Sequence, residues 1–448
     1  GTTTFPVRFV SAREEAEPGD WYGIRILEET EAFNVSQVEI AHAVRGVTLD
    51  NNDHIVAGST IRDCLYAGIY VNGGTPEIES MVIHDNRFGI YVTDATVQAV
   101  DLTLRNNDED GLYLRSSGFV VDTCRIHDNG GNGIDGYNTA GAGRSLQLTR
   151  CLINHNGENG ILVNRNRFSA YSVTLTSSAV THNTERGIYG TTGDRASIDC
   201  RWSNTWGNAQ GDYSGVSFNS NECIRYNPLY ADADARNYAP TRWSPHRALG
   251  QNGDPIGPVP YAEAIGPQIM GYLWEDFTFT RQESPYTILG DVVVPAGVTV
   301  TVEPGVEFRV SDEDGMRGGV SGDTEFRFLP GSVAHIGAAP DDREPTGITG
   351  EPIRFRSGAD EPQPGDWYGL RLEDVAAGSW IYNARFDHMD YAVYALGAAP
   401  PALDYLTVFQ ATNTGIYVRD AAAATRAKIH GCQIIGRERG RNIGIYLY

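Results

Sequence analysis

The sequence predicts an all-β fold, a parallel β-helix (solenoid) in which each coil of the chain stacks on the one before it. Glycines open short apolar strands at intervals of 23, 22, 21, 22, 22, 27 and 27 residues, and this is the length of one coil of such a solenoid. No amphipathic helix lies between the strands, so βαβ crossovers cannot join them in parallel. The strand-opening glycines are Gly23, Gly46, Gly68, Gly89, Gly111, Gly133, Gly160 and Gly187.

Each strand that follows a glycine alternates in polarity, as a strand with one buried face does. In Gly68-Ile-Tyr-Val we expect Ile69 and Val71 to point inward and Tyr70 to point outward. A second set of strands precedes the glycines, and an aliphatic residue seven positions before each glycine predicts a second buried row. Its members are Ile61, Val82, Leu104, Ile126, Ile153 and Val180.

Asparagines stand four residues before four of the glycines, at Asn107, Asn129, Asn156 and Asn183. Their polar contexts suit turns and left-handed backbone. In coils stacked about 4.8 Å apart, their amides would hydrogen-bond from one coil to the next. We interpret them as a structural ladder rather than a binding site.

These repeats resemble the right-handed parallel β-helix repeat family, the pectate-lyase-like superfamily, including secreted or cell-surface bacterial members. The resemblance covers most of the chain. It implies a right-handed solenoid and an extracellular or cell-surface bacterial location. It identifies a fold far better than an activity.

An internal duplication predicts two tandem β-helix domains. The segment that runs from Pro6 through Pro18-Gly-Asp-Trp-Tyr-Gly returns from Pro352 at an offset of 346, with 12 of 23 aligned positions identical. The segment between the copies loses the period and resembles the closing cap of secreted β-helix proteins. The expected domains are 1–265, with coils over 1–205 and a cap over 206–265, and 266–448, which begins with N-terminal coils and is truncated at its C-terminus. We therefore expect a piece of a longer array.

Composition excludes some classes of function. The chain has 35 Lys+Arg against 57 Asp+Glu, a net charge of -22, which is the opposite of a nucleic-acid binder. No run of 18 or more apolar residues exists, so no membrane span is expected within this sequence. Lys428 is the only lysine, which removes lysine-based catalysis from nearly all of the chain.

The six cysteines lack the spacing of zinc sites. We expect buried free thiols. Cys124 and Cys151 both stand nine residues before their glycines, so they should stack inward on neighbouring coils, and a disulfide between them is the alternative. The full set is Cys64, Cys124, Cys151, Cys200, Cys223 and Cys432.

The residues two positions after the glycines should form an outward column rich in tyrosine. Such rings suit sugar stacking, and the alternative is that they pack against one another. The column comprises Arg25, Thr48, Tyr70, Tyr91, Tyr113, Asp135, Leu162 and Tyr189, and in the second copy Arg371, Tyr394, Tyr417 and Tyr446. The candidate glycan-binding residues are Tyr70, Tyr91, Tyr113, Tyr137, Asn164, Tyr189 and Tyr417.

A catalytic site, if there is one, is expected where the coils lengthen between Gly133 and Gly187. Asp135 and Arg115 are the candidate catalytic residues. The resemblance implies the lyase pattern, in which a carboxylate or calcium neutralises a uronate and a basic residue removes the C5 proton. The clustered aspartates of pectate lyases and the paired aspartates of polygalacturonases are not matched, so an ordinary surface pair is the other interpretation.

No metal site is assigned. A polar column five residues before the glycines would suit zinc, although hydrogen-bonded stacking at a turn is the preferred interpretation. The acidic, glycine-rich turns at 106–111 and 127–133 suit Ca²⁺. The polar column comprises His84, Asn106, Asp128, His155 and His182.

The preferred function is a non-enzymatic extracellular or cell-surface scaffold, fibre or adhesin that contacts glycans through the tyrosines. Its expected partners are a polysaccharide or further copies of the chain in a fibre. The alternative is a secreted polysaccharide lyase, hydrolase or epimerase that acts in a groove on the exterior. A scaffold should repeat its exposed columns in both copies, whereas an enzyme should concentrate unusual residues in one.

Overall fold

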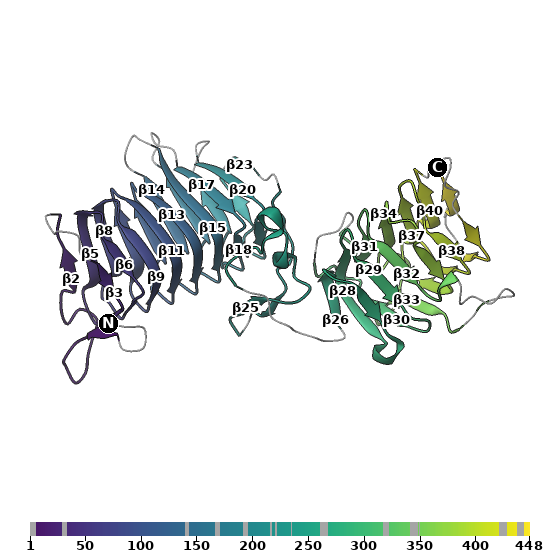
Figure 1. The fold of residues 1–448 in the computed structure, drawn as a ribbon, viewed down its shortest axis with the longest axis horizontal. Coiled ribbons are helices and arrows are strands. Elements are labelled where there is room, and N and C mark those ends of the chain that lie inside the picture. Colours follow the sequence, from purple (N-terminus) through teal and green to yellow (C-terminus); the bar gives the residue numbers. More distant parts are fainter. Residues whose placement is uncertain are drawn as a thin grey trace. The chain divides into compact units, whose positions relative to one another are not determined.

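The protein is an all-β parallel solenoid, as the glycine spacing predicts (Figure 1). The computed structural model describes residues 6–28, 34–138, 143–165, 171–190, 196–215, 217–219, 222–233, 235–259, 268–316, 322–340, 348, 350–420, 428–436 and 443–448. The chain divides into two compact units, each with a hydrophobic core of its own. The first unit comprises Gly1–Pro228 and His246–Pro260, and the second comprises Leu229–Pro245 and Tyr261–Tyr448.

The first unit contains two large parallel sheets that share one core. The larger sheet has the order β1 (Val7–Phe9), β4 (Val38–Ala41), β7 (Thr60–Arg62), β9 (Glu77–His84), β11 (Thr96–Arg105), β13 (Gly118–His127), β15 (Arg144–Asn154), β17 (Tyr171–Thr176), β20 (Ala196–Arg201) and β23 (Ser217–Asn219). Beside this path lie β3 (Val35–Ser36), β6 (Ile55–Ala57), β18 (Ala179–Thr181) and β21 (Asn204–Trp206). The second sheet has the order β2 (Ile24–Ile26), β5 (Arg45–Asn52), β8 (Ala67–Gly74), β10 (Phe88–Thr93), β12 (Leu112–Arg115), β14 (Ile134–Asn138), β16 (Ile161–Arg165), β19 (Ile188–Gly190) and β22 (Tyr213–Ser214).

The second unit is built in the same way. One sheet has the order β42 (Gln433–Ile435), β39 (Thr407–Phe409), β36 (Ala384–Asp387), β33 (Ile353–Ser357), β30 (Glu307–Val310), β28 (Tyr286–Val294), β31 (Glu325–Phe328), β34 (Gly369–Glu373), β37 (Tyr391–Leu396), β40 (Thr414–Arg419) and β43 (Ile443–Leu447), with β26 (Gln268–Tyr272) beside β28. The other has the order β27 (Phe277–Phe279), β29 (Thr299–Val302), β32 (Val333–Ile336), β35 (Trp380–Tyr382), β38 (Ala402–Asp404) and β41 (Ile429–His430).

The remaining elements are short. β24 (Tyr230–Asp232) and β25 (Asn237–Pro240) form an antiparallel pair, and 3₁₀ turns occupy Pro245–Arg247, Gln251–Gly253 and Arg281–Glu283. None of the helices in the described part of the chain has the length and apolar character needed to span a bilayer.

The glycine period has a steric cause. A Cβ added at Gly111 would lie 2.6 Å from Ile126 Cγ2 and 2.9 Å from the carbonyl oxygen of Gly133 in the next coil. Any side chain there would push the coils apart. The duplicated Gly23 and Gly369 carry a further constraint, because both have positive φ, +100° and +133°, where residues other than glycine are strained.

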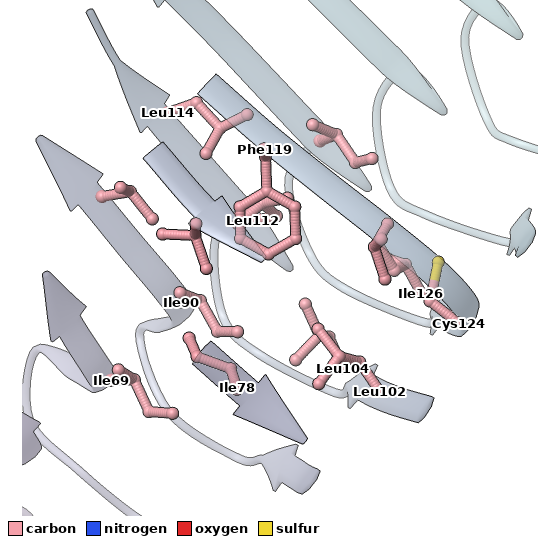
Figure 2. Close-up of a cluster of buried hydrophobic side chains, with 14 of the residues drawn as sticks. Ile69, Ile78, Ile90, Leu102, Leu104, Leu112, Leu114, Phe119, Cys124 and Ile126 are labelled. Carbon is pink, nitrogen blue, oxygen red and sulfur yellow. The ribbon is translucent and has the colours of Figure 1, made fainter. Parts of the chain in front are cut away.

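The apolar rows line the interior as predicted, with one exception. Ile69, Ile90 and Leu112 lie in register on neighbouring strands and are fully buried (Figure 2). Val82 is the exception, since Ile83 points inward in its place and pairs with Ile61. The coil from Gly68 to Gly89 is 21 residues long, one residue shorter than its neighbours, and the missing residue falls between Ile83 and Gly89.

The asparagines form a continuous ladder inside the first unit. The side-chain amide of Asn107 donates to Asn129 at 2.8 Å, Asn129 donates to Asn156 at 2.9 Å, and Asn156 donates to Asn183 at 2.9 Å. Asn86 and Asn208 extend the ladder at its two ends. At this turn the left-handed residue in all four coils is the one before the asparagine, and not the asparagine itself. Positive φ is found at Asn106, Asp128, His155 and His182.

The duplicated segment folds alike in both units. The indole nitrogen of Trp21 donates to the carbonyl of Ala41 at 2.9 Å, and that of Trp367 donates to the carbonyl of Asp387 at 3.1 Å. Asp20 accepts hydrogen bonds from Ser11 and from the backbone of Glu17, and its counterpart Asp366 accepts from Ser357 and Gln363. The segment therefore has the same structural role in both units.

The tandem arrangement with a domain boundary at 265 stays a prediction. The contacts assign Leu229–Pro245 of the irregular segment to the second unit.

The cysteines differ in part from expectation. Cys124 and Cys151 are buried free thiols in register on β13 and β15, and burial raises the pKa of Cys124. Cys200 and Cys223 form a disulfide, so the expectation of free thiols is wrong for this pair. Cys223 belongs to the irregular segment that follows the last regular coil, and this segment lies beside β20, which holds Cys200. The spacing of the cysteines in the sequence does not predict that contact.

Candidate functional site

The predicted outward column of the first unit is a continuous row across neighbouring strands. Tyr70, Tyr91 and Tyr113 pair in register on β8, β10 and β12, and Asp135 on β14 follows them. The row then passes through Leu162 to Tyr189, so Tyr189 is separated from the other tyrosines. We call Tyr70, Tyr91 and Tyr113 the tyrosine column.

The rings of the tyrosine column stack on one another. The centroids of Tyr70 and Tyr91 are 5.3 Å apart at an interplanar angle of 17°, and those of Tyr91 and Tyr113 are 4.6 Å apart at 26°. Tyr66 lies 5.5 Å from Tyr91, and Phe88 lies 5.7 Å from Tyr113. Both faces of Tyr91 are therefore covered, and a sugar cannot stack on them.

Burial affects the hydroxyl groups of these tyrosines. It raises the pKa of Tyr66 to about 12, and it also raises the pKa values of Tyr70 and Tyr113. The phenols thus stay protonated at neutral pH, and each offers one hydrogen-bond donor and acceptor. What the column presents to solvent is a row of ring edges and hydroxyls.

The second unit repeats this arrangement. The rings of Tyr394 and Tyr417 are 4.6 Å apart at 4°, and those of Tyr417 and Tyr446 are 4.9 Å apart at 5°. The guanidinium of Arg371 lies 5.6 Å from the centroid of the Tyr394 ring. The predicted Tyr417 is therefore the middle ring of a second stack.

A groove of about 930 Å³ opens beside the first end of the tyrosine column. At this end Arg45 places its guanidinium 3.7 Å from the centroid of Tyr70. Tyr22 is 89% exposed. The groove is lined by Tyr22, Gly23, Arg25, Val44, Arg45, Thr48, Asp50, Leu65, Tyr66, Arg87 and Asp108.

The charges of the groove are unevenly paired. Arg25 forms an ion pair with Asp50 at 2.6 Å, and Arg87 forms one with Glu109 at 2.9 Å. Arg45 forms no ion pair with any carboxylate in the described part of the chain. Its charge is met by the ring faces of Tyr66 and Tyr70.

The lining is specific to the first unit. At the offset of the duplication, Tyr391 stands where Arg45 does and Leu396 stands where Asp50 does. Tyr368, the counterpart of Tyr22, is only 8% exposed. This groove was not predicted from the sequence. A comparison of the two copies at these positions would have shown that the lining residues differ between them.

The candidate catalytic residues lie on neighbouring strands. Asp135 is 8% exposed, and Tyr137 on the same strand pairs with Arg115 on β12 and with Asn164 on β16. Arg115 is exposed and makes no ion pair within the described residues. The side chain of Asn164 and residues 139–142 and 166–170 lie outside the described residues. The catalytic roles stay a prediction.

The backbone conformation explains which residue types occur in the polar column considered for zinc. Asn106, Asp128, His155 and His182 all have positive φ, which Asn, Asp and His tolerate better than most residues. The rings of His155 and His182 stack 5.3 Å apart. Among the residues that the structure describes, no group of three or more His, Cys, Asp or Glu is arranged to hold a metal ion. Calcium binding stays a prediction.

A second polar ladder was not predicted. Asp110 accepts from the backbone and side-chain amides of Asn132, at 2.7 Å and 3.1 Å, and Asn132 accepts from Asn159 at 3.0 Å. Burial raises the pKa of Asp110 to about 6. Each of these residues directly precedes a strand-opening glycine. This shared position is the sequence pattern from which the second ladder could have been predicted.

The family comparison agrees with the fold. Residues 22–171 match the family model described as right handed beta helix region. A search of curated proteins returned no match. Among solved structures, pectate lyase Pel9A is 13% identical with a TM-score of 0.41, over 57% of this chain and 86% of that one.

Two further solved structures are A-modules of mannuronan C-5 epimerases of Azotobacter vinelandii. The module of AlgE6 is 12% identical with a TM-score of 0.31, over 94% of this chain and 90% of its own. The module of AlgE4 is 12% identical with a TM-score of 0.25, over 96% of this chain and 89% of its own.

Proposed function

We propose that this right-handed parallel β-helix protein is a non-enzymatic extracellular or cell-surface scaffold or adhesin that binds a glycan in the groove of its first unit. The observation that carries the proposal is the groove itself, at the head of the tyrosine column. It combines an exposed aromatic ring, Tyr22, with a guanidinium, Arg45, that has no carboxylate partner within the described residues.

The chemistry of the lining suits a saccharide. Binding sites for small ligands combine apolar surface with a few convergent polar groups. Tyr22 and Leu65 offer exposed apolar surface, and Arg25, Asp50 and Arg87 offer donors and acceptors. Tyrosine presents both an apolar face and a hydroxyl, which sugars match with C–H groups and hydroxyls.

The tyrosine column takes a different role from the one expected from sequence. Because the ring faces cover each other, the column would support the groove and extend it as a row of hydroxyls about 4.8 Å apart. A polymer seated in the groove would meet this row along the sheet. Tyr70 links the two features, since its ring contacts Tyr91 of the column and Arg45 of the groove lining.

The scaffold part of the proposal is supported by repetition. The stack of Tyr394, Tyr417 and Tyr446 repeats the geometry of the tyrosine column in the second unit. A column that recurs in both units is what we expect of a scaffold. The alternative, a polysaccharide lyase, hydrolase or epimerase, predicts turnover as well as binding.

The test is binding and turnover with neutral and uronate polysaccharides, using the full chain. We expect binding without new reducing ends or unsaturated products, and we expect Tyr22→Ala and Arg45→Gln each to weaken binding about tenfold, from the loss of stacking or of a charged hydrogen bond. Matched controls are Tyr448→Ala, an exposed tyrosine elsewhere, and Arg125→Gln, an exposed arginine on β13. Turnover that disappears with Asp135→Ala or Arg115→Ala would overturn the proposal.

A further inference from the structure

The chain contains six dipeptides in which asparagine is followed by glycine. In such a dipeptide the backbone nitrogen of the glycine can attack Cγ of the asparagine side chain, because glycine has no Cβ to obstruct the approach. The sequence alone therefore marks six positions at which the protein could modify itself. The asparagines are Asn72, Asn129, Asn132, Asn156, Asn159 and Asn252.

The reaction needs only water as a co-reactant. A bond forms between the glycine nitrogen and Cγ, the bond from Cγ to the side-chain nitrogen breaks, and ammonia leaves with the proton of the attacking nitrogen. Water then opens the cyclic imide at one of its two carbonyls and gives aspartate or isoaspartate. Neither an oxidant, nor a reductant, nor a catalytic residue takes part, so the local structure decides which dipeptides react.

Four of the six dipeptides belong to the two polar ladders of the first unit. Their asparagines are at most 4% exposed. Asn129 donates to Asn156 at 2.9 Å, and Asn159 donates to Asn132 at 3.0 Å. The attacking nitrogens are held as well, because each donates to a backbone carbonyl of a neighbouring coil; they belong to Gly130, Gly133, Gly157 and Gly160. These four dipeptides can react only while the coil is open.

Asn72 is exposed, but its backbone is held in a sheet. It lies near the end of β8, which pairs with β5 on one side and with β10 on the other. Its side chain donates to Asp50 at 3.3 Å. The attack requires rotation of the backbone at the asparagine, and pairing on both sides of the strand resists that rotation.

Asn252 is exposed and lies outside the sheets. It is the middle residue of the 3₁₀ turn Gln251–Gly253 and has a φ of 60° and a ψ of 20°. The nitrogen of Gly253 donates to Gly250 of the same turn at 3.2 Å. Within the described residues, no heavy atom lies within 4 Å of the position that a Cβ would take at Gly253. Rotation at Asn252 therefore meets no packed neighbour and disturbs only a local hydrogen bond.

We propose that Asn252 is a site of spontaneous modification, at which the folded protein converts an asparagine into aspartate and isoaspartate. Isoaspartate carries the backbone through the former side chain, so it lengthens a turn that Gly250 and Asp254 close with a 2.8 Å hydrogen bond. The backbone nitrogen of Gln251 also donates to Ser177 at 2.9 Å in this turn. The site lies outside the groove, and the inference does not depend on glycan binding.

The experiment compares the rate of amide loss at each dipeptide in the folded full chain and in the chain unfolded by guanidinium chloride, both at mildly alkaline pH. The samples are digested at acidic pH, where the reaction is slow, and mass spectrometry measures the fraction of each peptide converted from amide to acid. We expect folding to slow Asn252 by less than about threefold and the four ladder asparagines by roughly 30-fold or more, since the latter react only while buried hydrogen bonds are broken.

Asn252→Gln is the matched variant. It keeps a neutral, exposed amide, but its longer side chain would have to close a less favourable six-membered ring. It should abolish the acid product in that peptide and leave conversion at the other dipeptides unchanged. Folding that slows Asn252 as strongly as the ladder asparagines would overturn the proposal. So would a folded chain in which Asn72 keeps more of its unfolded rate than Asn252 does.

Discussion

The guanidinium of Arg45 lies 3.7 Å from the centroid of the Tyr70 ring, where it covers the end of a stack that continues through Tyr91 to Tyr113. Arg371 and Tyr394 begin the equivalent stack of the second unit. In both units a cation therefore lies over the first ring of the stack, where the negative face of an aromatic ring attracts it. The stacks are part of the packing of the fold, and their stability can be measured.

Replacement of Tyr91, the middle ring of the tyrosine column, should destabilise the protein. Tyr91→Ala removes two stacked contacts and the partial burial of the ring, so we expect a loss of about 2–3 kcal/mol in the free energy of unfolding. Tyr91→Phe keeps the ring and should cost well under half as much. Denaturant titration would check both values, and an equal loss in the two variants would show that the hydroxyl and not the stack matters.

The asparagine ladder should be sensitive at its centre. Asn129→Ala removes a donor to Asn156 and an acceptor for Asn107, and it leaves buried amide groups unpaired. We expect a loss of about 2–4 kcal/mol, since each unsatisfied buried group costs about 1–3 kcal/mol. Asn72→Ala, at an exposed position with one 3.3 Å hydrogen bond, is the control in the same unfolding assay. A small effect at Asn129 would mean that water replaces the ladder.

Asp110 should make the first unit less stable as the pH rises. Burial raises its pKa from 3.8 to about 6, and Glu158 and Glu109 add repulsion. The folded state therefore holds a proton that the unfolded state has lost, and this stabilisation is complete below about pH 3.8 and is lost as the pH rises through about 6. Asp110→Asn should raise the stability at neutral pH and flatten this part of the pH profile. A variant less stable than the wild type at pH 7 would contradict the assignment.

His246 should act in the opposite direction. It is fully buried, its Nε2 lies 2.7 Å from the side-chain amide of Asn204, and burial lowers its pKa from 6.5 to about 3. The unfolded state takes up a proton first, so stability should fall as the pH drops from about 6.5 towards 3. His246→Gln keeps a polar partner for Asn204 and should remove this acid-side slope. Thermal unfolding from about pH 7 to about pH 4 provides the measurement, and an unchanged slope would assign acid sensitivity to other groups.

The sequence predicted the direction of a side chain correctly where that direction is set within a single strand. Alternation within a strand placed Tyr70 outward and Ile69 inward, because successive side chains of a strand point to opposite faces. It failed at Val82, where counting back from Gly89 assumed a constant coil length. The structure shows that Ile83 occupies the buried position instead.

The sequence by itself determined the solenoid and the spacing of its coils, because the close approach of the coils admits only glycine at Gly111 and its equivalents. It also determined the asparagine ladder, which follows from that spacing. Only the tertiary structure decided what the outward side chains do. Whether Tyr91 offers its faces to a sugar or to Tyr70 and Tyr113, and whether Arg45 meets a carboxylate or a ring, depends on neighbours about one coil away along the chain. Those contacts arise from the register between coils and from the segments that interrupt this register. The disulfide between Cys200 and Cys223 arises in the same way.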